Sequence, residues 1–134
     1  MAILFPSEAW IKAFMAQLNN SMAYAEIAKN WEGDLLFQVE WPDGSPPTLL
    51  YMDLWRGKCR DGYVAPDPAQ KAAFRLTAPI GNFTKILKGE LDPMQAMVTG
   101  KLKVQGNMVM LMKNIPTVLE FVRTAQQVET EFPK

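Results

Sequence analysis

The chain has no histidine and only one cysteine among its 134 residues. Without imidazole it cannot build a Ser-His-Asp or Cys-His nucleophile pair. Zinc sites that use histidine or paired thiolates are excluded as well, since one thiol cannot supply two ligands. The single Cys59 also forbids an internal disulfide and fits a reducing compartment.

Long apolar runs and targeting signals are lacking too. Runs such as Met108–Met112 fall far short of the ~20 residues of a membrane-spanning helix. The N-terminal residues include no basic region, and Pro6 and Glu8 stand where the apolar core of a signal peptide would continue. The sequence Glu131–Lys134 is not a peroxisomal Ser-Lys-Leu signal. These features predict a cytoplasmic protein.

Neither sign of charge dominates, because 14 basic and 14 acidic residues cancel and are dispersed along the chain. Nucleic-acid binding needs a clustered basic face, and the sequence shows none. With 49% hydrophobic and 21% charged residues, the composition is that of a folded globular chain. We therefore expect one domain over residues 1–134, with no nucleic-acid partner.

Apolar spacing and turn residues predict the elements of an α+β domain. A run of strands followed by helices favours a five-stranded, mostly antiparallel sheet that is covered on one face by helices. The strands are expected at Leu35–Trp41, Thr48–Trp55, Cys59–Val64, Ala72–Ala78 and Lys101–Gln105. Ser7 and Ser21 are expected to cap the helices that follow them. Further helices are expected from Pro79 to Leu87 and opening at Pro93, Met108 and Pro116, with Val128–Lys134 as a frayed tail.

The strand Thr48–Trp55 leaves two orientations open. Its odd positions, such as Tyr51 and Trp55, share one face, and its even positions, such as Met52, share the other. A slip of one residue in the pairing would exchange the two faces, so the pattern does not decide which one is buried.

The stretch Lys88–Met112 is the most informative part of the chain. Asp92 can cap a short helix with Pro93 at its first position. The residues 100–106, Gly-Lys-Leu-Lys-Val-Gln-Gly, form an alternating strand bounded by glycines. Asn107 can then cap a helix rich in methionine, a flexible side chain that adapts to irregular apolar partners.

This stretch resembles the sterol carrier protein 2 family. Gly89, Asp92-Pro93 and the segment from Gly100 to Gly106 match the family's signature, and the rest of the chain fits its layout in outline. The resemblance implies a sheet with helices on one face, an apolar tunnel between them, and binding of lipids without chemistry on them. No cofactor and no metal are implied.

The resemblance and the methionine-rich stretch together predict a ligand-lining wall. Most aromatic residues, including Trp10, Phe14, Phe37 and Phe121, are interpreted as core, and Phe83 is assigned to the wall. The candidate ligand-binding residues are Phe83, Leu87, Met94, Met97, Leu102, Val104, Met108, Leu111, Met112, Leu119 and Val122.

Three functions compete. The first is a non-catalytic intracellular carrier for a fatty acyl, sterol-like or isoprenoid ligand. Its expected partners are lipids such as fatty acids or acyl-CoA, and such a carrier could contact a membrane transiently. The second is an accessory subunit that presents a hydrophobic intermediate, such as a quinone precursor, to a partner enzyme. The third is a lipid-modifying enzyme, which the missing histidine disfavours. The carboxylates of Glu32, Asp34, Asp61 and Asp67 are interpreted as solvated, as is the basic hairpin at 56–60.

Overall fold

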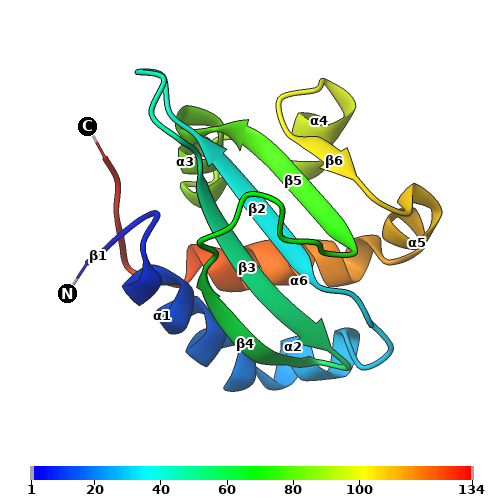
Figure 1. Ribbon diagram of the computed structural model, residues 1–134. Helices are drawn as coiled ribbons and strands as arrows, with labels where there is room; N and C mark the ends of the chain where they lie inside the picture. The colour runs from blue at the N-terminus through cyan, green and yellow to red at the C-terminus, as the bar shows by residue number, and fades with distance from the viewer. Residues whose placement is uncertain (1, 134) are drawn as a thin grey trace.

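The computed structural model describes residues 2–133 and centres on a five-stranded sheet with the order β4-β3-β2-β5-β6 (Figure 1). The central pair β2 and β5 is parallel, and the other neighbours are antiparallel. The predicted five-stranded, mostly antiparallel sheet is therefore confirmed. The strands are β2 (Leu35–Glu40), β3 (Thr48–Trp55), β4 (Lys58–Val64), β5 (Phe74–Pro79) and β6 (Lys103–Gln105).

N-cap side chains, which accept hydrogen bonds from backbone N–H groups of the first turn, explain where four of the helices begin. The side chains of Ser7, Ser21, Asp92 and Asn107 each accept a hydrogen bond from a backbone N–H three residues later, at 2.9–3.1 Å. All four predicted caps are confirmed. The helices are α1 (Glu8–Asn19), α2 (Met22–Ile27), α3 (Ile80–Leu87), α4 (Pro93–Val98), α5 (Met108–Lys113) and α6 (Ile115–Gln126).

The helices lie on one face of the sheet, and the connection from β4 to β5 crosses the other face (Figure 1). Arg75 holds that connection in place by donating to the carbonyl oxygens of Pro68 and Gln70 at 2.9 and 3.2 Å. Beneath it lies a small apolar cluster of Leu36, Leu49 and Ala65. The main core lies on the helix-covered face.

The orientation of β3 is resolved by this layering. Leu50, Met52 and Leu54 are buried in the main core, and Tyr51 packs against the small cluster on the other face. The antiparallel pairing with β2 places Leu50 opposite Phe37 and Met52 opposite Leu35, so these side chains share a face.

The expected frayed tail is wrong for the described residues of that segment. The strand β1 (Ile3–Leu4) pairs in parallel with β7 (Thr130–Glu131), and the Ile3 N–H and Phe5 N–H donate to the carbonyls of Glu129 and Glu131 at 2.9 Å. Val128 is buried beside them. Lys134, the last residue of the predicted tail, lies outside the described residues. The two ends of the chain therefore lie side by side (Figure 1).

The strand β6 begins two residues later than expected, because the Leu102 N–H donates to the Ala96 carbonyl at the end of α4, at 3.0 Å, instead of joining the sheet. Its end at Gln105 is as expected, and a close backbone approach marks it. Gly106, directly after β6, has φ of 148°, and a Cβ atom there would lie 2.7 Å from the carbonyl oxygen of Ala73 and 2.4 Å from the Phe74 ring. Only glycine tolerates this approach, so Gly106 brings the end of β6 onto the beginning of β5.

Candidate ligand-binding site

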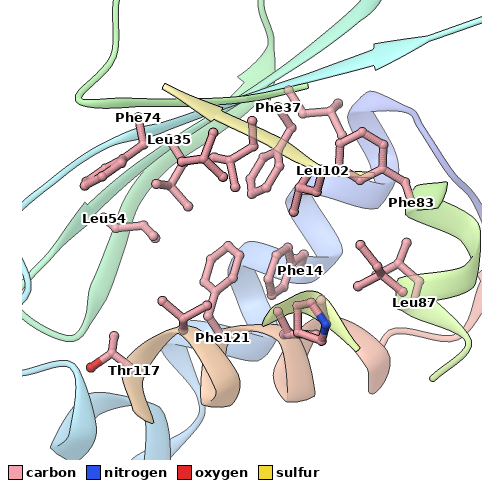
Figure 2. A pocket seen from close by; sticks show the side chains of 18 of the residues that line it. Phe14, Leu35, Phe37, Leu54, Phe74, Phe83, Leu87, Leu102, Thr117 and Phe121 are labelled. Atoms are coloured by element: carbon pink, nitrogen blue, oxygen red, sulfur yellow. The ribbon is translucent and has the colours of Figure 1, made fainter. Parts of the chain in front are cut away.

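An apolar pocket lies between the sheet and the helices that cover it (Figure 2). Its enclosed space is about 110 Å³, and a wider space around it opens to solvent. Ligand pockets in proteins are lined mostly by hydrophobic and aromatic side chains, so this lining suits a small molecule with an apolar part.

The sheet supplies one wall of the pocket. Alternate residues of each strand point to the same face, so every second side chain of the inner strands reaches the space. Figure 2 shows Leu35, Phe37 and Leu54 directed from the sheet towards the helices. The sheet residues that line the pocket are Leu35, Phe37, Leu50, Leu54, Phe74, Leu76 and Val104.

The helices and their connections supply the opposite wall. The α6 side chains Thr117 and Phe121 face the sheet across the pocket, and Phe83 of α3 closes one side (Figure 2). All six helices contribute at least one side chain. The remaining lining residues are Phe5, Trp10, Phe14, Tyr24, Trp31, Phe83, Ile86, Leu87, Pro93, Met97, Leu102, Leu111, Thr117, Val118, Phe121, Val122 and Ala125.

Aromatic contacts connect the two walls. The rings of Phe37 on β2 and Phe121 on α6 are nearly parallel, at 10°, with centroids 6.1 Å apart. Phe121 also contacts Phe14 at 4.9 Å, and Phe37 contacts Phe83 at 6.2 Å with an edge-on geometry. Such pairs stabilise the arrangement beyond the burial of their area. They fix the spacing between sheet and helices around the empty volume.

Several polar groups of the wall are hydrogen-bonded within the protein. The indole N–H of Trp10 donates to Thr130 Oγ1 at 2.9 Å, and that of Trp31 donates to the Gly33 carbonyl at 2.9 Å. The Thr117 hydroxyl donates to the Ile27 carbonyl at 3.0 Å. Among the described residues that line the pocket, none has a charged side chain. The wall therefore favours hydrocarbon over a buried charge.

Seven of the eleven residues predicted to bind a ligand lie in this wall. The other four do not, although each is on a helix that contributes another side chain to the pocket. In α5, Leu111 is only 5% exposed, whereas Met108 and Met112 are 38% and 46% exposed. The predicted residues in the wall are Phe83, Leu87, Met97, Leu102, Val104, Leu111 and Val122, and those outside it are Met94, Met108, Met112 and Leu119. Their role in ligand binding stays a prediction.

Sequence reasoning missed the contribution of the N-terminal half. Trp10, Phe14, Trp31 and Phe37 of that half were expected in the core, as was Phe121 of α6, and each lines the pocket. Their helical or alternating spacing predicts an inward position, but a core residue and a pocket residue share that spacing. Conversely, Met97 is the one methionine among the described residues that lines the pocket, so methionine content was a poor guide to the wall.

The cysteine and the carboxylates, which could support covalent or acid–base chemistry, lie outside the pocket wall. Cys59 is buried on β4, and burial raises the pKa of its thiol to about 12, which keeps it protonated. Asp34 accepts hydrogen bonds from the Tyr51 hydroxyl at 2.7 Å and from the Ala73 N–H at 2.6 Å. Within residues 2–133, His, Cys, Asp and Glu side chains form no group of three that could hold a metal ion.

No helix within residues 2–133 combines the length and the apolar character that crossing a membrane requires.

Comparison with known proteins identifies relatives of the whole fold. The family model described as the SCP-2 sterol transfer family matches residues 9–118. The crystal structure of sterol carrier protein 2 is 32% identical, with a TM-score of 0.84, and the match covers 91% of this chain and 97% of that one. The solution structure of a conserved hypothetical protein from Thermus thermophilus is also 32% identical, with a TM-score of 0.85 and coverage of 98% and 93%.

A curated relative is much longer than this chain. Sterol carrier protein 2 from Rattus norvegicus is 32% identical over 88 residues, which are 66% of this chain and 16% of the rat protein. The match therefore concerns one portion of that protein.

Proposed function

Because the chain belongs to the SCP-2 sterol transfer family, we propose that it is a lipid-binding carrier that holds a fatty acyl, sterol-like or isoprenoid molecule in the apolar pocket. The observation that supports this most directly is the wall itself, in which aromatic and aliphatic side chains from sheet and helices surround an empty volume. Thr117, the residue of α6 that brings a hydroxyl group to the wall, donates its proton to the Ile27 carbonyl instead of directing it into the space.

The energetics of hydrocarbon burial favour such a ligand. Burying a sixteen-carbon chain at ~0.8 kcal/mol per CH₂ contributes roughly 12 kcal/mol before any cost is counted. Association and ordering oppose this by at least ~4 kcal/mol. The difference is compatible with micromolar binding without a demanding polar contact, which suits a carrier that must release its ligand.

The uncharged wall also constrains how an amphiphile is held. A carboxylate or phosphate moved into this space would lose its hydration without gaining a partner of opposite charge. We propose that the apolar tail occupies the pocket and that a charged head group stays at its open side. Selectivity then depends on the length and width of the tail.

The test is displacement of a fluorescent fatty acid from the purified protein, with native mass spectrometry to identify any lipid that co-purifies. We expect saturable binding at micromolar concentration and stronger displacement by longer chains. If no probe of any chain length binds saturably, and no lipid co-purifies, the carrier function is wrong.

We propose further that the chain has no catalytic activity of its own and acts in the cytoplasm. Absence of histidine and burial of Cys59 support the first part. An assay with acyl esters tests it, and turnover that is abolished by Cys59→Ala or Asp61→Asn would contradict it. The accessory-subunit function stays a prediction, and co-purification with a biosynthetic enzyme would support it.

A further inference from the structure

The outer face of the sheet, opposite the helices, has a small open hollow of its own. It lies where the connection from β4 to β5 reaches the beginning of β5, beside the edge strand β6 (Figure 1). Its wall consists of residues 69–73 of the connection, Arg75 on β5, and Gln105 and Gly106. Val104, the neighbour of Gln105, lines the apolar pocket, so the hollow and the pocket lie on opposite faces of β6.

Arg75 brings to this wall a positive charge without a carboxylate partner. Each of the other three arginines of the chain forms an ion pair with an aspartate or glutamate, whereas Arg75 forms none with any described residue. This half-buried side chain donates only to neutral oxygens, those of the Gln38 side chain and of the Pro68 and Gln70 carbonyls. A charge that is partly removed from water is normally paired, so the lone guanidinium suits an anion from outside the chain.

The wall also has hydrogen-bond donors that the protein does not use. A guanidinium has five N–H groups, and the three acceptors of Arg75 occupy at most three of them. The backbone N–H groups of Lys71 and Ala72, in the same wall, donate to no other described residue. Free N–H groups beside a positive charge are the donors that a phosphate group, with its several acceptor oxygens, can use.

Two lysines add to the positive charge. Lys71 lies in the wall, and Lys103 lies on the same face of β6 as Gln105; both lysines are exposed. Among the described residues that line the hollow there is no aspartate or glutamate. Asp34 and Asp67 lie at its rim, where each accepts a hydrogen bond from a backbone N–H of the connection, at 2.6 and 2.9 Å. The wall itself is therefore cationic.

The positive charge is confined to one part of the outer face. Glu40 on β2 accepts from the Gln38 side chain at 3.4 Å, and Asp53 and Asp61 lie opposite each other on β3 and β4. These carboxylates interrupt any extended basic surface of the kind that nucleic acids need. A small anion fits the local charge better than a macromolecule.

From this arrangement we propose that the hollow binds the phosphate group of a small soluble compound. A phosphate monoester has a charge of about −1.5 to −2 at pH 7, which suits a site with Arg75, Lys71 and Lys103 better than a single carboxylate does. The head group of a carried lipid is a poorer candidate, because its tail would occupy the pocket on the other face of the sheet. The site does not depend on the proposed carrier function.

The test is titration of the purified protein with sodium pyrophosphate, followed by amide NMR spectra. We compare the wild type with Arg75→Gln and Lys71→Gln; the matched control is Lys58→Gln, which removes an exposed lysine from β4 at the opposite edge of the sheet. We expect saturable shifts at residues 69–73 and 105–106, with a dissociation constant on the order of 1 mM or below. Binding should be about tenfold weaker for Arg75→Gln, about threefold weaker for Lys71→Gln and unchanged for Lys58→Gln.

The Lys71→Gln variant guards against a purely structural effect of Arg75, which holds the connection in place. The Lys71 side chain is exposed and has no hydrogen bond or ion pair with another described residue, so its replacement should leave the thermal midpoint unchanged. Weaker binding at an unchanged midpoint therefore supports the site.

Three outcomes would overturn the proposal. These are no saturable shift in the wall, equal weakening by Lys71→Gln and Lys58→Gln, or shifts in the wall with palmitoyl lysophosphatidate but not with pyrophosphate. The last outcome would assign the hollow to the head group of a carried lipid. Fluorescent fatty acid binding should be the same for the wild type and Lys71→Gln, so the phosphate site and the carrier function can fail separately.

Discussion

Met97 and Met112 are the same type of side chain, one helix apart, in different environments. Met97 is half-buried and lines the pocket, whereas Met112 is 46% exposed and lies outside the wall. This pair allows an isosteric test, because glutamine has nearly the shape of methionine and adds an amide. An amide is costly only where it must leave water.

We predict that Met97→Gln weakens binding of a fluorescent fatty acid about five- to hundredfold, since an unpartnered buried amide costs ~1–3 kcal/mol. Met112→Gln should leave the affinity within about twofold. Titration of both variants and the wild type with the same probe measures this. Equal affinity of all three proteins would mean that the ligand does not contact Met97.

The thiol of Cys59 gives a second residue-scale prediction. Burial raises its pKa from 9.0 to about 12, and its S–H donates to the Asp61 carbonyl at 3.3 Å. We expect iodoacetamide to modify the native protein at pH 8 at least about a hundredfold more slowly than the protein in concentrated guanidinium, because the thiolate is the reactive form. Mass spectrometry of timed samples measures the two rates, and similar rates would show that the thiol is accessible and ionised.

The same shift has a consequence for stability. A folded-state pKa above the ordinary value means that the folded state binds the proton more tightly than the unfolded state. The resulting stabilisation is fully present below pH 9 and is lost as the pH rises through about 12. The contribution of Cys59 to the free energy of unfolding in urea should therefore stay constant between pH 6 and 8 and fall as the pH rises above 9.

At the scale of elements, the pairing of β1 with β7 holds one end of the pocket in place. Thr130, in β7, accepts the indole N–H of Trp10 and donates to the Val128 carbonyl at 2.8 Å. We predict that Thr130→Val lowers the free energy of unfolding by about 1–3 kcal/mol, because it leaves the buried indole N–H without its acceptor at nearly unchanged volume. Urea unfolding measures the change.

The control for that prediction is Thr99→Val at the end of α4. Thr99 is exposed, and its hydroxyl only donates to the carbonyl of Gln95 in its own helix, at 2.8 Å. This control should cost well below 1 kcal/mol. A Thr130→Val variant as stable as Thr99→Val would mean that the β1–β7 pairing does not depend on the Trp10 contact.

Local signals predicted most elements, and long-range pairing explains the exceptions. The caps at Ser7, Ser21, Asp92 and Asn107 depend on neighbouring residues, so the sequence is sufficient to find them. The pairing of β1 with β7 joins two-residue strands from opposite ends of the chain, and neither strand is long enough to show alternation. The frayed-tail prediction failed for that reason.

At the scale of the whole molecule, occupation of the pocket should stabilise the fold. A ligand present at a hundred times its dissociation constant stabilises the state that binds it by about 2.7 kcal/mol. We predict that palmitate raises the thermal midpoint by several degrees and that butyrate, which buries far less hydrocarbon, does not. Differential scanning fluorimetry with matched sodium salts measures this, and an equal rise with both acids would point to a general effect of the carboxylate.

The site could be predicted in part because the motif-bearing segment Lys88–Met112 contributes side chains to the pocket. Leu102, Val104 and Leu111 were expected in the wall and lie there. Phe14, Phe37 and Phe121 could not be assigned to it, since the sequence shows that a side chain is turned inward but not whether another side chain fills the space in front of it. That distinction depends on how sheet and helices are spaced.

The contact between the two ends of the chain also sets an order of events during folding. Residues 3–4 pair with residues 130–131, so this pairing closes a loop that contains almost the entire domain. During synthesis, Phe5 and Trp10 are made early, but β7, which provides their hydrogen-bond partners, is made more than a hundred residues later. The end of the pocket that they line is therefore completed last, and a nascent chain that already contains the sheet still has an unsealed pocket.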